Sequence, residues 1–360
     1  GATEDYGDWK PLADQPDVRR VTLFPGLVYE RIPLLKRIWR LLGQACKADT
    51  ICMGIGYNHL DVLIVSWLLR LLGKRVIMLN DTKFEDRPRT VAGELLKRVA
   101  LACFNAGIVA GGRNLEYFRF LGFRGRRLLP GCDGIDLERV RLEVGGAGSA
   151  AAVKFEDRPF VFVGRLVDVK NLPVLIEGYA HYVRAQNHRP RRLVLVGAGP
   201  LEPDMRRHVA ALGVEHLVDF AGFTSADETG RMISQAAALV LTSYSETWGM
   251  VVNEAMALGI PVIVSEAVGS RDVMVRNLVS GIVFESGCSQ SLACALSAVG
   301  HDEALWHRLA DGAGQRAWLG DSEIFADAVE LLHFPSAQPA EERISRYLAE
   351  IQGYLGRAPY

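Results

Sequence analysis

Short apolar runs alternate with amphipathic stretches along the chain, most clearly in its second half. Several runs there are almost wholly apolar, as in Phe-Val-Phe-Val and Leu-Val-Leu-Val. Continuous apolar strands between helices are typical of parallel sheets that are buried on both faces. Strands are therefore predicted at Phe160–Gly164, Leu193–Gly197, Val218–Ala221, Ala238–Thr242 and Pro261–Ser265.

The first half follows the same rhythm less regularly. Its helix-like stretches are Leu34–Cys46 and Leu60–Leu72. A polar segment, Gly1–Asp17, stands where a doubly wound domain usually opens with a strand and a Gly-rich turn. We therefore expect one βα unit to be absent from this chain or replaced. Strands are predicted at Val21–Phe24, Thr50–Ile55, Arg75–Leu79, Gly107–Ala110 and Arg127–Leu129.

This alternation predicts an α/β protein with two Rossmann-like, doubly wound domains that face each other across a cleft. Small residues without periodicity, from Gly145 to Ser149, are typical of a linker. We expect an N-terminal domain at residues 1–148, a second domain at 149–330, and a C-terminal helix in 331–360 that packs back on the first domain.

Composition narrows the function classes. Hydrophobic residues make up 49% and charged residues 23% of the chain, which is a globular composition. The net charge of −1 argues against a nucleic-acid partner. The charge is uneven: residues 1–145 carry 23 Lys and Arg against 17 Asp and Glu, and the rest carries 18 against 25. Anionic partners are therefore expected on the N-terminal half.

The cysteines and the apolar runs bear on metals and on location. Six cysteines are scattered without a Cys-x-x-Cys pair or a His cluster, so no metal site is predicted. Scattered cysteines suit a cytoplasmic protein. The longest apolar run, Val62–Leu69, is too short to span a bilayer.

Two cations follow the strand that ends at Gly164. Arg165 and Lys170 lie five positions apart across a strand-to-helix turn, where both could reach one anionic group. A diphosphate is the natural target; the alternative is a pair of solvated surface cations. The next strand ends in Gly197-Ala198-Gly199, which allows close backbone approach. Glu202 stands where a third glycine would be, which argues against a standard NAD site.

The richest segment runs from Ser243 to Gly259. A helix is predicted to begin near Gly249, with Glu246 in the preceding turn and Glu254 inside the helix. Carboxylates accept hydrogen bonds and so suit sugar hydroxyls, whereas free amides near a helix start suit phosphate. The alternative is a capping carboxylate and a solvated Glu.

These motifs resemble family 4 of the glycosyltransferases, a GT-B family of mostly retaining enzymes. Glu246 and Glu254 match its pair of glutamates separated by seven residues, with Trp248 in an aromatic position. The likeness covers about residues 45–330 and is specific from 158 to 285. Further matches are Gly164-Arg165-Leu166 with Lys170, Gly197-Ala198-Gly199-Pro200-Leu201, Phe220-Ala221-Gly222-Phe223, Gly269 with Asp272, and, more weakly, Gly131–Asp136 with the family's Asn-Gly-Val-Asp stretch.

The resemblance implies a site for a nucleotide-sugar donor in the second domain and for an acceptor on the first. Arg165 and Lys170 would neutralise the leaving diphosphate, while Glu246 would contact the transferred sugar and Glu254 the ribose. Transfer would retain configuration, with no cofactor beyond the donor and no metal. The remaining donor-binding residues would be Trp248, Gly249, Met250, Gly197, Gly199, Gly222 and Phe223.

The acceptor side departs from the family. Many relatives carry a His after the third strand of the first domain, where this chain has Asn80 and Asp81. Either could bind a sugar hydroxyl, or the pair could be a polar turn. His59, at a strand-to-helix turn, is a third candidate, or a helix-start hydrogen bonder. Lys83, Arg87 and Arg89 could meet an anionic acceptor or be solvated loop charges.

The stretch Arg31–Leu42 reads as a basic amphipathic helix with apolar positions at 34, 35, 38, 41 and 42. It could lie on an anionic membrane or pack on the sheet. By resemblance, the acceptor would be a glycan or a lipid-linked sugar in bacterial polysaccharide or glycoconjugate synthesis, at the inner face of the plasma membrane. The alternatives are a catalytically silent nucleotide-sugar-binding module and a GT-B-fold sugar-nucleotide epimerase or phosphorylase.

Overall fold

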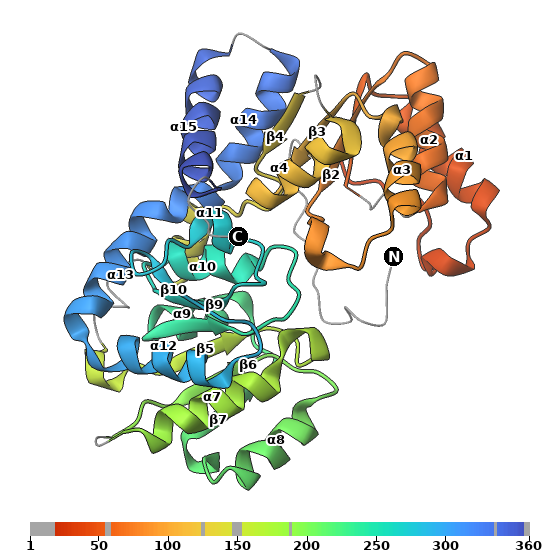
Figure 1. Cartoon of the computed structure of the whole chain (residues 1–360). Coiled ribbons are helices and arrows are strands. Elements are labelled where there is room, and N and C mark those ends of the chain that lie inside the picture. Colours follow the sequence, from red (N-terminus) through yellow and green to blue (C-terminus); the bar gives the residue numbers. More distant parts are fainter. Residues whose placement is uncertain are drawn as a thin grey trace. The chain divides into compact units, whose positions relative to one another are not determined.

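A computed structural model of the chain describes residues 19–54, 59–123, 127–145, 153–186, 189–334 and 337–355 (Figure 1). Its contacts divide the chain into two compact units. Unit 1 comprises Gly1–Asn80, Thr90–Gly107 and Leu121–Arg127; unit 2 comprises Asp81–Arg89, Ile108–Phe120 and Leu128–Tyr360. Two segments of the first half, Asp81–Arg89 and Ile108–Phe120, therefore belong to the same unit as the second half.

The first half forms a four-stranded sheet in the order β1-β2-β3-β4, with β1 and β2 parallel. Its strands and helices are β1 (Thr50–Met53), β2 (Arg75–Asn80), β3 (Ala106–Val109), β4 (Arg127–Pro130), α1 (Leu34–Ala45), α2 (Leu60–Leu71), α3 (Val91–Ala100), α4 (Gly112–Phe118) and α5 (Leu137–Glu143). The strand predicted at Val21–Phe24 is wrong: bends and a turn replace it, because Pro25 lacks an amide hydrogen and Gly26 takes a φ of +69°. The expected loss of a βα unit stays a prediction.

Helix α1 begins at Leu34, after a 3-10 turn at Tyr29–Arg31. Ile38 is buried, whereas the side chain of Leu35 is 71% exposed and that of Trp39 is 73% exposed. The apolar face is thus split between the interior and the surface.

Unit 2 contains a six-stranded sheet in the order β10-β9-β8-β5-β6-β7, and every recorded pairing in it is parallel. Its strands are β5 (Phe160–Val163), β6 (Leu193–Val196), β7 (Val218–Gly222), β8 (Ala238–Leu241), β9 (Val262–Ser265) and β10 (Gly281–Phe284). The strands predicted for the second half are confirmed, and β10 was missed. The apolar runs are central: β8 and β9 are wholly buried.

The helices of the second half cover both faces of this sheet (Figure 1). Helix α15 contacts α14, α11 and α4, and its Tyr347 hydroxyl donates to the carbonyl of Ala110 at 3.3 Å. The predicted domain boundaries themselves stay predictions. The helices are α7 (Leu172–Arg184), α8 (Glu202–Ala211), α9 (Ala226–Ser234), α10 (Met250–Ala257), α11 (Arg271–Met274), α12 (Ser289–His301), α13 (Glu303–Arg316), α14 (Ser322–His333) and α15 (Gln338–Leu355).

The strand order shows where the topology of this sheet reverses. The chain enters this sheet at β5, adds β6 and β7 on one side, and then returns to add β8 on the other side of β5. The loops after β5 and β8 therefore diverge at a topological switch point, where open α/β sheets bind ligands.

Candidate functional site

The two loops at the switch point are tied to each other through their backbones. After β5, residues Asp168–Lys170 form a 3-10 turn, and Asn171 takes a left-handed conformation that starts α7. The Thr242 hydroxyl, at the end of β8, donates to the carbonyl of Lys170 at 2.8 Å, and the Tyr244 amide donates to the carbonyl of Val169 at 3.1 Å. These bonds fix where the Lys170 side chain begins.

Lys170 and Glu246 meet at this point. The Lys170 ammonium donates to a carboxylate oxygen of Glu246 at 2.5 Å, and the Ser243 hydroxyl donates to the same oxygen at 3.0 Å. The two charged side chains are each 17% exposed, so the pair is shielded yet still reachable from solvent. Arg165, five residues earlier, is exposed and makes no side-chain hydrogen bond or ion pair with described residues.

Glycines let the loops after β5 and β6 pack backbone against backbone. A Cβ on Gly197 would lie 2.0 Å from the carbonyl oxygen of Gly164, and one on Gly199 would lie 2.4 Å from that of Leu166. The Gly197 amide donates to the carbonyl of Gly222, at the end of β7, at 2.7 Å. The predicted donor-binding glycines therefore line one row of strand ends, with Phe223 exposed beyond it.

Helix α10 begins at Met250, after Gly249 turns the chain with a φ of +95°. The Met250 side chain is 40% exposed at the start of this helix. Trp248 is placed differently, because only 3% of its side chain is exposed and its indole N–H donates to Asn253 at 3.0 Å. The indole thus supports the turn from the interior and offers little surface to a donor.

Glu254 is set apart from the Lys170–Glu246 pair. Burial raises the pKa of its carboxyl group, the positive charge of Arg139 lowers it, and the negative charge of Glu143 raises it again. Both of those residues belong to α5, against which α10 packs. The structure therefore brings together Glu246 and Lys170, whereas the charges acting on Glu254 come from α5.

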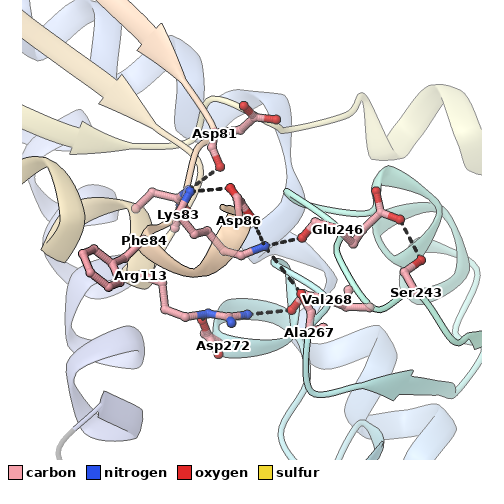
Figure 2. A network of polar contacts seen from close by, with 12 residues as sticks. Asp81, Lys83, Phe84, Asp86, Arg113, Ser243, Glu246, Ala267, Val268 and Asp272 are labelled. Atoms are coloured by element: carbon pink, nitrogen blue, oxygen red, sulfur yellow. Dashed lines mark hydrogen bonds and ion pairs between the residues drawn. The ribbon is translucent and has the colours of Figure 1, made fainter. Parts of the chain in front are cut away.

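The loop after β2 contributes a cation whose role the sequence analysis misjudged. Lys83 is neither solvated nor facing solvent: it is 2% exposed. Its ammonium lies 3.0 Å from Asp86 and donates to the carbonyls of Glu246 and, at 3.5 Å, Ala267 (Figure 2). The nearby Arg89 guanidinium donates to the Lys83 carbonyl at 2.6 Å. No sequence pattern distinguished Lys83 from its basic neighbours.

The turn that carries Glu246 is also paired with the loop after β9. The Gly269 amide donates to the carbonyl of Glu246 at 3.0 Å, and a Cβ on Gly269 would lie 1.7 Å from the carbonyl oxygen of Thr247. Arg113, from α4, donates to the carbonyl of Val268 at 2.8 Å and pairs with Asp272 (Figure 2). The resemblance flagged Gly269 and Asp272, but not Arg113.

The predicted acceptor residues have mixed surroundings. In unit 1, His59 precedes α2 and packs edge-on against Tyr29 at 5.0 Å between ring centroids, and Asn80 is buried at the end of β2. In unit 2, the Asp81 backbone carbonyl accepts from the Asn114 amide. The carboxylate of Asp81 acts on Asp133: burial first, and then that negative charge, raise the pKa of Asp133 to about 7.

Comparisons with known proteins show which families the chain resembles. Residues 150–316 match the family model described as glycosyl transferases group 1. A D-inositol 3-phosphate glycosyltransferase from Streptomyces bingchenggensis is 32% identical over 213 residues, 54% of this chain and 47% of that protein. An alpha-D-kanosaminyltransferase from Streptomyces kanamyceticus is 31% identical over 159 residues, 44% of this chain and 40% of that protein. The chain spans about half the length of the curated relatives it matches.

Solved structures share the fold at low identity. A sucrose-phosphate synthase from Thermosynechococcus elongatus superposes with a TM-score of 0.66 and 23% identity, over 83% of this chain and 77% of the other. HepE from Anabaena in complex with UDP gives a TM-score of 0.65 and 18% identity, over 81% of each chain.

The fold and the arrangement at the switch point define a protein of GT-B architecture, with two Rossmann-like α/β parts. The chain is similar to family 4 of the GT-B glycosyltransferases, and its residues 150–316 match the glycosyl transferases group 1 family.

Proposed function

We propose that this protein is a glycosyltransferase that moves a hexose-type sugar from a nucleotide-diphosphate donor to a glycan or lipid-linked acceptor, with retention of configuration. The observation that carries the proposal is the contact of Lys170 with Glu246 at the switch point between β5 and β8. It joins a phosphate-binding cation to a sugar-binding carboxylate at one place in the sheet.

In this proposal Arg165 and Lys170 neutralise the diphosphate as it leaves the anomeric carbon. Lys170 has an ammonium group that Glu246 already orients, and Arg165 is free to turn toward an incoming anion. Glu246, in the turn before α10, then contacts the transferred sugar. The bond from the anomeric carbon to the diphosphate oxygen breaks, and the acceptor oxygen bonds to that carbon on the same face. The proton of the acceptor hydroxyl passes to the departing diphosphate.

The rest of the donor would follow the row of glycines. We propose that the nucleoside lies along the strand ends at Gly197, Gly199, Gly222 and Phe223, and that amides at Gly249 and Met250 assist the phosphate. Glu254 is proposed to bind the ribose. The buried Trp248 indole is proposed to support the turn before α10. Because two cations face the diphosphate, we propose that no metal is required. Activity that EDTA abolishes and Mg²⁺ restores would contradict this.

The first experiment is thermal unfolding against UDP, GDP, ADP, dTDP and their common sugars. A ligand at about 100 times its dissociation constant adds roughly 2.7 kcal/mol to the free energy of unfolding. One nucleotide should raise the unfolding temperature selectively, and Lys170→Met should lose this shift while Lys74→Met, at a remote exposed pair, keeps it. No shift with any nucleotide would contradict the proposal.

Product analysis separates the alternatives. A silent binding module would show the thermal shift but release no nucleoside diphosphate from the matching donor. An epimerase would convert the donor without an acceptor. The proposed transferase should instead release the diphosphate faster when a glycan or lipid-linked acceptor is added, and it should leave the donor sugar unaltered in configuration.

We also propose that α1 rests on an anionic membrane surface at the inner face of the plasma membrane, in bacterial polysaccharide or glycoconjugate synthesis. Leu35 and Trp39 are exposed one turn apart, and Lys36 and Arg40 are exposed beside them. Within the described part of the chain, no helix is long and apolar enough to cross a membrane. Trp39→Ala should weaken sedimentation with anionic vesicles severalfold, and neutral vesicles should bind poorly.

A further inference from the structure

Lys83 is a buried ammonium held by a complete set of partners. An unpaired charge would be costly at 2% exposure, but the Lys83 ammonium pairs with Asp86 at 3.0 Å and donates to two carbonyls. Asp86 also accepts from the Lys83 backbone amide at 2.7 Å. The side chain and backbone of Lys83 are therefore fixed together by one carboxylate.

Both carbonyls belong to loops that build the proposed donor site. One is that of Glu246, and the other is that of Ala267, in the loop after β9 that pairs with the Glu246 turn. The Glu246 carbonyl also accepts from the Gly269 amide at 3.0 Å. Two donors from different segments of the chain therefore hold the peptide group of Glu246, while Lys170 and Ser243 hold its carboxylate.

A second cation from the first half stabilises the same loop. Arg113 donates to the Val268 carbonyl at 2.8 Å, one residue beyond Ala267, and pairs with Asp272 (Figure 2). The peptide group of Glu246 thus belongs to a network whose two cations, Lys83 and Arg113, precede residue 120. Neither cation makes a recorded contact with Gly197, Gly199 or Gly222, or with the Lys170 side chain.

We propose that Lys83 is a positioning residue for the transfer reaction: it fixes the Glu246 backbone so that the carboxylate meets the donor sugar in the reactive geometry. This inference rests on the proposed function. Because the contact is made to the backbone of the sugar-side residue, its loss should impair transfer much more than nucleotide binding. A small displacement of a catalytic group costs large factors in rate while leaving the ligand bound.

The test compares Lys83→Met with Lys83→Arg and with Lys74→Met as a matched control. The probe is the nucleotide sugar that stabilises the wild-type protein, followed by release of its nucleoside diphosphate and by calorimetric binding of that diphosphate. Lys83→Met should lower kcat at least roughly tenfold and change the Kd of the diphosphate by less than about threefold. Lys83→Arg, which keeps a cationic donor, should recover a large part of kcat, and Lys74→Met should match the wild type.

Several results would overturn the inference. One is a kcat of Lys83→Met within about twofold of the wild type. Another is a loss of diphosphate affinity as large as the loss of kcat, which would indicate general unfolding of the site. If Lys83→Met does not fold, Asp86→Asn takes its place, since it loosens the Lys83 ammonium and should lower kcat severalfold at unchanged Kd; an unchanged kcat would equally overturn it. A wild-type protein that neither binds nor turns over any nucleotide sugar would contradict both the proposed function and this inference. An active wild type with an equally active Lys83→Met variant would contradict only the inference.

Discussion

The ammonium of Lys170 lies 2.5 Å from the carboxylate of Glu246, although 76 positions separate the two residues in the chain. In this state the two charges neutralise each other. Under the proposed function, a diphosphate that binds Lys170 would compete with Glu246, so the pair would couple donor binding to the release of the carboxylate toward the sugar.

This coupling predicts opposite behaviour for two substitutions. Lys170→Met removes a phosphate-binding charge and should weaken diphosphate binding by about tenfold or more. Glu246→Gln removes the competing carboxylate, so diphosphate binding should be equal or tighter while transfer falls by about a hundredfold. Calorimetry and product release measure the two quantities separately. Equal losses of affinity in both variants would contradict the prediction.

The close backbone contact at Gly197 predicts that a single added methyl group lowers stability strongly. In Gly197→Ala the new Cβ would meet the Gly164 carbonyl oxygen at 2.0 Å, and the φ of +127° is strained for alanine. The loops after β5 and β6 must separate, so we expect a loss of about 2–4 kcal/mol in the free energy of unfolding and loss of the nucleotide-induced thermal shift. The control is Gly314→Ala, where no atom lies within 4 Å and the residue is helical. It should leave stability unchanged or slightly raised; similar effects in both variants would exclude this explanation.

Asp133 predicts a pH-dependent stability. Its pKa is raised from 3.8 to about 7, so the folded protein binds more protons than the unfolded chain between about pH 4 and pH 7. The folded state is therefore favoured most below pH 4, and stability is lost as the pH rises to 7. Asp133→Asn removes this loss, so it should be more stable than the wild type by roughly 2 kcal/mol at pH 8 and about equal to it at pH 4.

Denaturant unfolding at both pH values checks this prediction. Asp311→Asn, at an exposed position, is measured at the same two pH values as a matched control. A constant difference between Asp133→Asn and the wild type across this range would mean that Asp133 ionises as it does in the unfolded chain.

Asn253 predicts a stability effect through hydrogen bonds alone. Its buried carboxamide accepts from the Trp248 indole at 3.0 Å and donates to the carbonyls of Asp133 at 2.9 Å and Gly320 at 3.1 Å. Asn253→Ala leaves these groups without their partner and should cost about 2–4 kcal/mol of unfolding free energy. At the exposed Asn277, whose side chain accepts a single bond from the Val283 amide, the alanine variant should cost less than about 1 kcal/mol. Thermal and denaturant unfolding distinguish the two, and an Asn253→Ala protein as stable as Asn277→Ala would contradict the argument.

The parallel sheets could be predicted because their strands are nearly continuous apolar runs, a pattern that does not depend on distant contacts. Val21–Phe24 misled for the converse reason: its composition suits a strand, but Pro25 and Gly26 end it. Strand β10, Gly-Ile-Val-Phe, is as long as β8 and β9 but begins with a glycine, which is depleted in strands, and it was missed. Strands could thus be predicted from local sequence where all of their residues are buried.

The candidate site also contains residues that local sequence could indicate and residues that it could not. The spacing of Arg165, Lys170 and Glu246 relative to strand ends placed them at one edge of the sheet, because parallel strands end together. Lys83 could not be recognised, since its meaning depends on Ala267 and Glu246, residues more than 160 positions away that the strand order brings close. The raised pKa of Asp133 likewise depends on burial and on Asp81, which no spacing reveals.

The contacts of Lys83 and Arg113 bear on what could be transplanted between proteins of this kind. The segment that matches the glycosyl transferases group 1 family, residues 150–316, carries Glu246 but neither of these two cations. A chimaera that joins this segment to a foreign N-terminal half would keep the turn that carries Glu246. It would lack the contacts of Lys83 and Arg113 that hold this turn and the loop after β9, unless the new half supplies equivalent cations. The module that recombination can move is therefore larger than the segment that matches the family model.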